Sequence, residues 1–262
     1  MFVTLDLFDE PIHRLRRSRA QRLGGEKFLH DRAFADCLDR LADVRQGFDR
    51  AYIAGWPDSR WRDELAAVVP DVMANDPATT QSLQLGAGQF DLCVSIGDLG
   101  SANDVQAAAF ALRHVLRPGG YLIGAIIGGH SLPRLRAAMV AADRVDGGIA
   151  PRLHPAIDGP SLAALLVSVG FVDPVVDVDR VEVRYRSLDR LIGDLRAMAC
   201  TNILTQRSRR PVTRHALAAA RAEFLAGNDH TLERFDLLHF AAWVPNTDRG
   251  NRHVNPVTGR VS

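Results

Sequence analysis

Residues 90–127 constrain the fold most strongly, because they form an apolar run, an amphipathic stretch and a second apolar run in close succession. The two runs (90–96 and 121–127) are nearly continuous, which is typical of parallel strands buried on both faces. Between them, apolar residues recur on one stripe of a helix, which an Arg-Pro-Gly-Gly turn ends. Ser101 or Asn103 is expected to cap the start of this helix. The unit predicts a strand–helix–strand crossover.

Periodicity in the rest of the chain extends this unit in both directions. Alternating strands and helices that end in a late strand pair predict an α/β fold: a doubly wound, mostly parallel sheet with an antiparallel C-terminal strand pair. Ser131, Ser187 and Thr213 are expected to cap three of the later helices. Besides residues 90–127, we expect strands at 48–54, 71–74, 82–85, 171–185 and 235–244, and helices at 27–42, 61–69, 131–142, 161–169, 188–198 and 215–225.

The element order also predicts how the chain is divided. We expect an N-terminal helical extension at 1–47, a main domain at 48–245 and a polar tail at 246–262. A helical insertion at 187–227 is expected to lie as a small lid over the carboxyl edge of the sheet. Open α/β sheets bind their ligands at that edge.

Composition narrows the classes of function. The formal net charge of +1 predicts no general attraction to nucleic acid or to an anionic membrane. The arginine-rich N-terminal segment lacks the aromatic residues that would favour nucleic-acid binding. No apolar run approaches the length of a membrane span, and no secretory signal is evident, so we expect a cytoplasmic protein. Histidine and cysteine spacing predicts no metal site.

A series of short motifs runs in order through most of the chain. They are Leu7-Phe8-Asp9 followed by the arginine run, Phe28-Leu29-His30-Asp31, Gly128-Gly129-x-Ser131-Leu132-x-x-Leu135-Arg136, residues 147–155, residues 176–185, and Asp194-Leu195-Arg196-x-Met198 with Asn202. With residues 90–127, they resemble the class I S-adenosylmethionine (SAM) dependent methyltransferases. The motifs are similar to one branch of that family, which includes relatives of the mitochondrial complex I assembly factor that hydroxylates an arginine of a partner subunit. A more distant similarity is to the malonyl-carrier-protein methyltransferase of biotin synthesis.

The chain departs from this branch at His130, where an aspartate is usual, and at Ala197 and Ala199, where glycines are usual. It therefore resembles a divergent member. The resemblance implies a methyltransferase fold, SAM as cofactor, and a small-molecule or protein substrate. A respiratory-complex subunit is the partner that the branch suggests.

The turn after the first strand matches the family's acid–x–Gly–x–Gly–x–Gly pattern only in part. Gly55 fits the first glycine, whereas Ile53 stands at the acidic position and Pro57 and Ser59 replace the later glycines. Such a loop normally lets the backbone approach the cofactor and offers free amide groups. Losing one charge-assisted hydrogen bond weakens binding by about 10- to 150-fold.

Other residues are candidates for the cofactor contacts that remain. Asp58 is a candidate replacement for the missing acid, although it lies at the wrong end of the turn. Asn75 or Asp76 is a candidate to hold the ribose, and a plain turn is an equally good interpretation of that segment. Ser95, on the strand at 90–96, completes the set.

A second group of residues is expected to face a substrate or a partner. His130 is the histidine best placed for chemistry, at the carboxyl end of the strand at 121–127, although a role as a polar neighbour of a helix cap is the preferred interpretation. Arg152, Arg184, Tyr185 and Arg196 are candidates to bind an acidic substrate or a partner protein, with surface salt bridges as the alternative. Methyl transfer depends mostly on alignment, so the sequence identifies no catalytic residue.

Two functions follow as hypotheses. The first is a SAM-dependent methyltransferase-like enzyme with weakened cofactor binding and an unidentified methyl acceptor. The second is a non-catalytic, or arginine-hydroxylase-type, assembly factor that binds a respiratory-complex subunit. The family resemblance favours the first, which is the main hypothesis, and the degraded glycine loop favours the second, which is the alternative.

Overall fold

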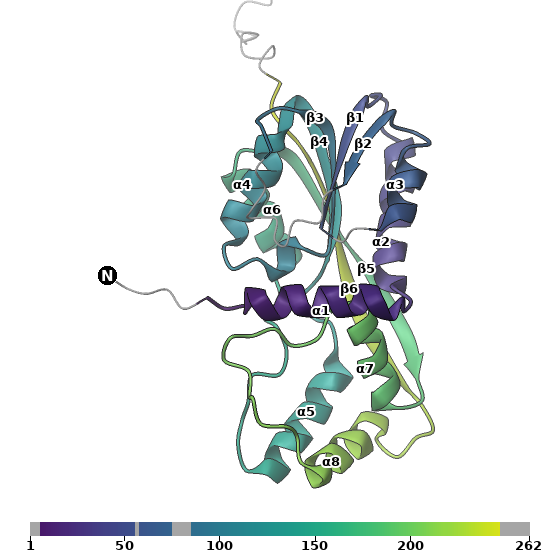
Figure 1. Ribbon diagram of the computed structural model, residues 1–262, viewed down its shortest axis with the longest axis vertical. Helices are drawn as coiled ribbons and strands as arrows, with labels where there is room; N and C mark the ends of the chain where they lie inside the picture. The colour runs from purple at the N-terminus through teal and green to yellow at the C-terminus, as the bar shows by residue number, and fades with distance from the viewer. Residues whose placement is uncertain (1–5, 56–57, 75–84, 247–262) are drawn as a thin grey trace, which may run out of the picture.

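The computed structural model describes residues 6–55, 58–74 and 85–246 and contains a six-stranded sheet in the order β2-β1-β3-β4-β6-β5 (Figure 1). Four parallel strands are followed by an antiparallel pair, which confirms the predicted fold class. The strands are β1 (Arg50–Gly55), β2 (Asp71–Ala74), β3 (Phe90–Ile96), β4 (Leu116–Ile127), β5 (Val172–Tyr185) and β6 (Thr231–Trp243). The strand predicted at 82–85 lies outside the described residues except for Leu85, which is not in a strand.

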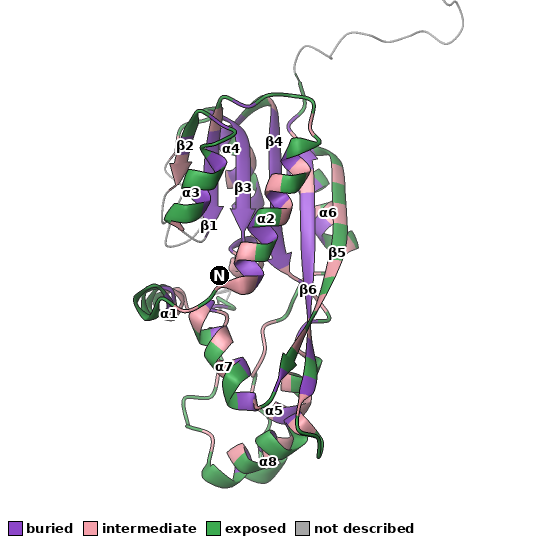
Figure 2. Cartoon of the chain, turned by 90° about the vertical axis from the view of Figure 1, so that its right-hand side faces the viewer, coloured by how far each residue is buried: buried purple, intermediate pink, exposed green. Residues whose placement is uncertain are grey.

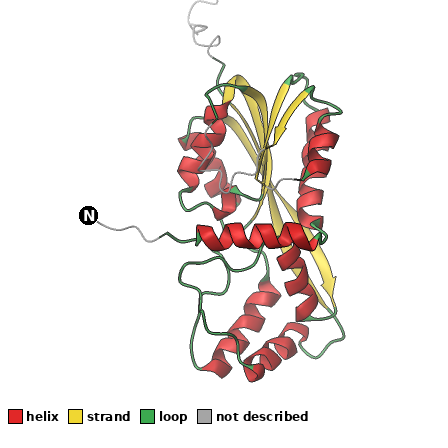
Figure 3. Ribbon diagram, viewed as in Figure 1, coloured by secondary structure: helices red, strands yellow, loops and turns green. Residues whose placement is uncertain are grey.

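Helices cover both faces of the sheet, as a doubly wound fold requires (Figure 3). Buried side chains of α2 and α3 share a hydrophobic cluster with one face, and those of α4 and α6 share a second cluster with the other face. The helices are α1 (Glu10–Leu23), α2 (Phe28–Ala42), α3 (Ser59–Leu65), α4 (Val105–Val115), α5 (Pro133–Asp146), α6 (Gly159–Ser168), α7 (Leu188–Ala197) and α8 (Arg214–Leu225), with a 3-10 turn, η2, at Leu99–Ser101. None of these described helices is long and apolar enough to cross a membrane.

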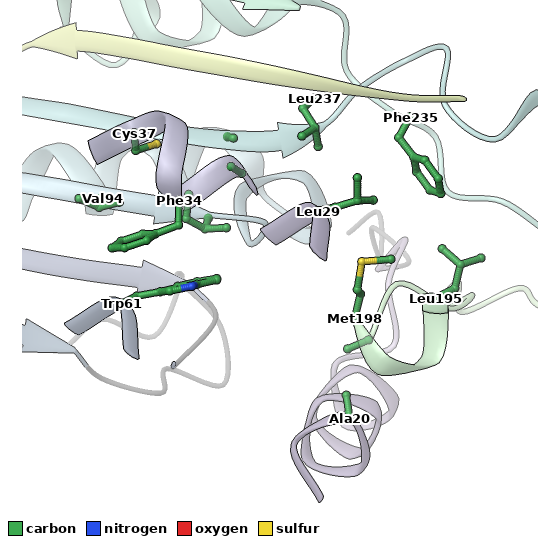
Figure 4. Close-up of a cluster of buried hydrophobic side chains, with 14 of the residues drawn as sticks. Ala20, Leu29, Phe34, Cys37, Trp61, Val94, Leu195, Met198, Phe235 and Leu237 are labelled. Atoms are coloured by element: carbon green, nitrogen blue, oxygen red, sulfur yellow. The ribbon is translucent and has the colours of Figure 1, made fainter. Parts of the chain in front are cut away.

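The first cluster extends beyond the sheet and joins the N-terminal helix to the rest of the molecule (Figure 4). Phe34 of α2 stacks on Trp61 of α3, with ring centroids 5.0 Å apart. Farther along the same cluster, Ala20 of α1 lies with Leu195 and Met198 at the end of α7. Burial of this continuous apolar surface positions α1 and α7 next to the sheet.

The predicted N-caps of α4 and α5 are both wrong. Asp104, not Ser101 or Asn103, caps α4, because its carboxylate accepts the Ala107 amide at 2.8 Å. The Asn103 side chain instead forms two hydrogen bonds with the backbone of Phe8, at 2.7 and 3.0 Å. Asn103 therefore holds the segment that leads into α1.

The start of α5 is also satisfied by a residue far away in the sequence. Ser131 forms hydrogen bonds with the backbone of Asp236 and does not cap the helix. The carboxylate of Glu233, which is fully buried, accepts the amides of Arg134 and Leu135 at 3.1 and 2.8 Å. The predicted caps Ser187 and Thr213 are confirmed for α7 and α8.

Strands β5 and β6 form a ribbon that runs past the end of the parallel sheet (Figure 2). Residues 237–243 of β6 pair with both β4 and β5, whereas residues 231–236 pair with β5 alone. Helices α5, α7 and α8 surround this free end, and α1 lies across the molecule between them and the sheet (Figure 1). We refer to α5, α7 and α8 as the cap.

Candidate functional site

A cavity of about 390 Å³ opens at the carboxyl ends of β3 and β4. Ile96 and Ile127 mark the two strand ends. Helix α1 contributes His13, Arg16 and Arg17 to its wall, and the cap contributes apolar side chains from α5 and α7. The cavity therefore lies where open α/β sheets bind ligands. The apolar lining from the cap consists of Leu135, Met139, Ile192 and Leu195, followed by Met198 just after α7.

Beside this cavity, Arg17 spans the crevice between β1 and β3. One guanidinium nitrogen donates to the Asp98 carboxylate at 2.6 Å, and the other donates to the Gly55 carbonyl at 2.6 Å. Arg17 is only 5% exposed and Asp98 only 7%. After β1 the chain forms β2 on one side of β1 and then β3 on the other side. The crevice between β1 and β3 is therefore the topological switch point of the sheet. A side chain of the protein itself therefore bridges the two strand ends that border this crevice.

Gly55 adopts a conformation that requires glycine, with φ of +103°. A Cβ at this position would lie 2.3 Å from the carbonyl oxygen of Ile96. The close approach that makes glycine necessary here is therefore to the neighbouring strand. Ile53, at the position of the family's acid, is buried in the core.

Asp58 is occupied by structural contacts. Its carboxylate caps α3 by accepting the Arg60 amide at 3.0 Å, and it forms ion pairs with Arg60 and Lys27. Burial would raise the pKa of Asp58, but hydrogen bonds from Arg60 and Lys27 outweigh burial and lower the pKa to about 2. Asp58 is thus a structural anion at the start of α3.

Of the other candidate cofactor residues, the structure describes Ser95. Ser95 is fully buried, and it alternates on β3 with the residues that face the first hydrophobic cluster, so it shares a face with Cys93. It does not line the cavity. Asn75 and Asp76 lie outside the described residues.

Among the candidate substrate or partner residues, Arg152 is the one that lines the cavity. It also forms an ion pair with the buried Asp143, at 2.5 Å. His130 is exposed and lines a separate surface depression beside α5. Tyr185 is buried and donates its hydroxyl proton to Asp194 at 2.8 Å, which ties β5 to α7.

Arg184 and Arg196 are both exposed and do not line the cavity. Arg184 lies 3.1 Å from the Nδ1 atom of His230 at the far end of β5. Arg196 lies on α7, close enough to Arg16 for its charge to lower the pKa of Arg16. The structure does not bring together as one site those predicted residues that it describes.

Sequence reasoning missed the residues that do converge here. Arg17, Asp98 and His30 come from α1, from the turn after β3 and from α2. Burial, followed by repulsion from Arg17 and Lys27, lowers the pKa of His30 to about 4, so its imidazole is neutral near pH 7. Asp98 follows a buried strand by two residues, a signal that was available in the sequence. Nothing in the arginine run distinguishes Arg17 from its neighbours.

Electrostatically, the cavity favours anions. Its lining contains a single acidic residue, Asp98, among the residues that the structure describes. The pKa values of His13 and His154 are lowered to about 4, mainly by burial, so these side chains add no charge near pH 7. The arginines in the lining are Arg16, Arg17, Arg136, Arg152 and Arg207.

Among the residues that the structure describes, those at this crevice do not fit SAM in the manner usual for the family. The acidic position carries a buried isoleucine, and the Gly55 carbonyl and the Asp98 carboxylate both accept hydrogen bonds from Arg17. A cationic cofactor entering this crevice would have to displace a buried guanidinium from its counter-ion. Groups of three or more potential metal ligands are absent from the described residues.

Comparison with known proteins gives a consistent picture. No protein-family model matches the chain. It is 26% identical over 273 residues to the mitochondrial arginine hydroxylase NDUFAF5 of Danio rerio, a match that covers 92% of this chain and 84% of the relative. It is 30% identical over 201 residues to the malonyl-[acyl-carrier protein] O-methyltransferase of Xylella fastidiosa, covering 75% of this chain and 63% of the relative.

A solved structure supports the fold. The structure of a candidate methyltransferase from Bacillus halodurans matches with a TM-score of 0.50 at 12% identity. The match covers 81% of this chain and 99% of that one. At this level of identity, the likeness concerns the fold alone.

Proposed function

We propose that this chain, a divergent member of the class I SAM-dependent methyltransferase family, has kept the ligand cavity of the fold. In this proposal it has lost the contacts by which the family usually binds SAM. In this proposal the protein acts as a binding factor of the assembly-factor type, with the respiratory-complex subunit suggested by the NDUFAF5 branch as its partner. One observation carries the proposal: Arg17 bridges the Gly55 carbonyl and the Asp98 carboxylate at the topological switch point.

The energetics of this bridge explain why SAM would bind weakly. Separating one partner from a buried ion pair costs about 3–5 kcal/mol, because a buried charge loses its compensation. Each 1.4 kcal/mol corresponds to about tenfold in affinity, so a cofactor that has to break the bridge loses at least about 100-fold. Replacement of the acid at Ile53 removes a further charge-assisted contact.

Calorimetry with SAM tests the proposal directly. We expect the full chain to give no binding heat at millimolar SAM. The variant Arg17→Ala removes the occupant of the crevice and should bind SAM more tightly than the unmodified protein does. Circular dichroism would verify that this variant is folded. Micromolar binding by the unmodified protein, abolished in Arg17→Ala, would show that Arg17 is part of a cofactor site.

That contrary outcome would favour a second candidate function, SAM-dependent methyl transfer. The observation that supports it is the 30% identity, over 75% of this chain, to a malonyl-[acyl-carrier protein] O-methyltransferase. The arginine-rich cavity is compatible with a carboxylate acceptor of the kind which that name describes. Product formation with radiolabelled SAM and a carboxylate acceptor would establish this function.

A further inference from the structure

We propose that the cavity binds an amphipathic carboxylate, with its apolar chain between α5 and α7 and its carboxylate on Arg16. The inference rests on the part of the proposed function in which the cavity receives a ligand, and it specifies the chemical class of that ligand. Three features of the cavity support it: an apolar interior, a buried nitrogen with no hydrogen-bond acceptor, and an excess of positive charge at that nitrogen.

The interior explains the apolar part of the ligand. Leu195 and Met198 are buried, and Leu135, Met139 and Ile192 pack against the same hydrophobic cluster while lining the cavity. A chain that enters this space gains about 25 cal/mol for each Å² of apolar surface removed from water. The volume of about 390 Å³ lies within the range of small-molecule sites.

Arg16 explains the anionic part. Its Nη1 atom is buried, yet it has no hydrogen-bond partner in the described part of the chain. Buried polar groups in proteins nearly always find a partner, and Arg16 lines the cavity, so a ligand acceptor that the guanidinium reaches by a small side-chain movement would satisfy this nitrogen. A carboxylate satisfies a guanidinium better than a neutral oxygen does, since both partners are charged.

The surroundings of Arg16 strengthen the case for an anion. Burial lowers the pKa of the Arg16 guanidinium, and the charges of Arg207, Arg19 and Arg196 lower it further. Asp9 opposes this effect, but its carboxylate already forms an ion pair with Arg207 at 2.9 Å. A bound anion would relieve the repulsion among these arginines, and a cation would increase it.

Calorimetry with three probes separates the contributions of the chain and the charge. Octanoate carries both features, octylammonium carries the same chain with the opposite charge, and acetate carries the charge without the chain. We expect octanoate to bind at least about tenfold more tightly than either of the others. Equal binding of octanoate and octylammonium, or no binding of octanoate, would overturn the proposal.

Variants of α1 then locate the carboxylate. Arg16→Gln should weaken octanoate binding by about tenfold or more, the effect of losing a charged hydrogen bond. Arg16→Lys should give an intermediate affinity, because it retains the charge but not the planar fork. Arg14→Gln, at an exposed arginine outside the cavity lining, is the matched control and should bind octanoate normally.

Unchanged octanoate binding by Arg16→Gln would contradict the assignment. None of these titrations contains SAM, so their outcome is separate from that of the SAM experiment. Tight SAM binding would refute the closed crevice and leave the octanoate results as the test of the ligand class.

Discussion

The Arg17 guanidinium lies 2.6 Å from the Asp98 carboxylate, and both side chains are buried at the carboxyl edge of the sheet. This pair joins the N-terminal helix to the turn after β3, two segments separated by 81 residues in the sequence. The pair therefore fixes the position of α1 over the sheet, and it places the Arg17 side chain in the crevice between β1 and β3.

Asp98→Asn should destabilise the fold, because it removes the counter-charge of a buried guanidinium. We expect the free energy of unfolding to fall by about 3–5 kcal/mol. The double variant Arg17→Met with Asp98→Leu should lose less than the sum of the single changes, since neither charge is then buried alone. Urea denaturation measures both effects. Arg221→Gln is the control, because its ion pair with Asp189 is exposed and contributes about 0–1 kcal/mol.

Acid should destabilise the protein through His30. The pKa of His30 is lowered from its ordinary value of 6.5 to about 4, mainly by burial. Between these values the unfolded chain binds more protons than the folded chain, so stability is lost as the pH falls from 6.5 to 4. The loss attributable to His30 is roughly 3 kcal/mol. His30→Gln should flatten the dependence of unfolding free energy on pH in this window, whereas His215→Gln, at an exposed site, should leave it unchanged.

Gly124→Ala should weaken the centre of the sheet. A Cβ at Gly124 would lie 2.1 Å from the carbonyl oxygen of Ser95 and 2.7 Å from the ring of Phe240. Because the first of these atoms is backbone in a paired strand, we expect a loss of about 1–3 kcal/mol or more from overpacking. Gly148→Ala is the control, since no atom lies within 4 Å of its Cβ position. Thermal unfolding compares the two variants, and equal melting temperatures would contradict the prediction.

Tyr185→Phe should weaken the attachment of α7, one of the three helices of the cap, without disturbing the sheet. The variant loses a hydrogen bond of 2.8 Å to the Asp194 carboxylate, worth about 1.5–3 kcal/mol for a charged acceptor. Amide hydrogen exchange should therefore accelerate in α7 and stay unchanged in β3. Arg184→Gln changes the exposed residue next to it and should leave exchange in α7 as it was.

The sheet was largely predictable from the sequence because its signals are local. The bounds of β2 agree with the prediction, and the amphipathic stripe of α4 lies where expected, since apolar periodicity reflects burial within each element. The helix N-caps Ser187 and Thr213 were predictable for the same reason, because the capping residue and its helix are adjacent in the sequence. The bonding of the first amides of α5 to Glu233 was not predictable, because it depends on how a distant strand packs against α5.

The site was much less predictable, because it is assembled from contacts between segments far apart in the sequence. The motif-based reasoning identified Gly55 and the defective glycine turn, but it could not show that Arg17 fills the crevice. Asp58 and Tyr185 are polar residues near the expected edge, yet their partners turn out to be Lys27 and Asp194. Residue type and spacing carry no information about such pairings.

The ribbon formed by β5 and β6 contributes to the shape of the cavity. Beyond β4, residues 231–236 of β6 pair with β5 alone among the described strands, and two-stranded ribbons twist more strongly than wide sheets. Glu233 of this segment accepts the amides of Arg134 and Leu135 at the start of α5, so the ribbon helps to set the position of a helix that lines the cavity. The shape of the cavity therefore depends on residues of the ribbon that do not line it, as well as on the residues of its wall.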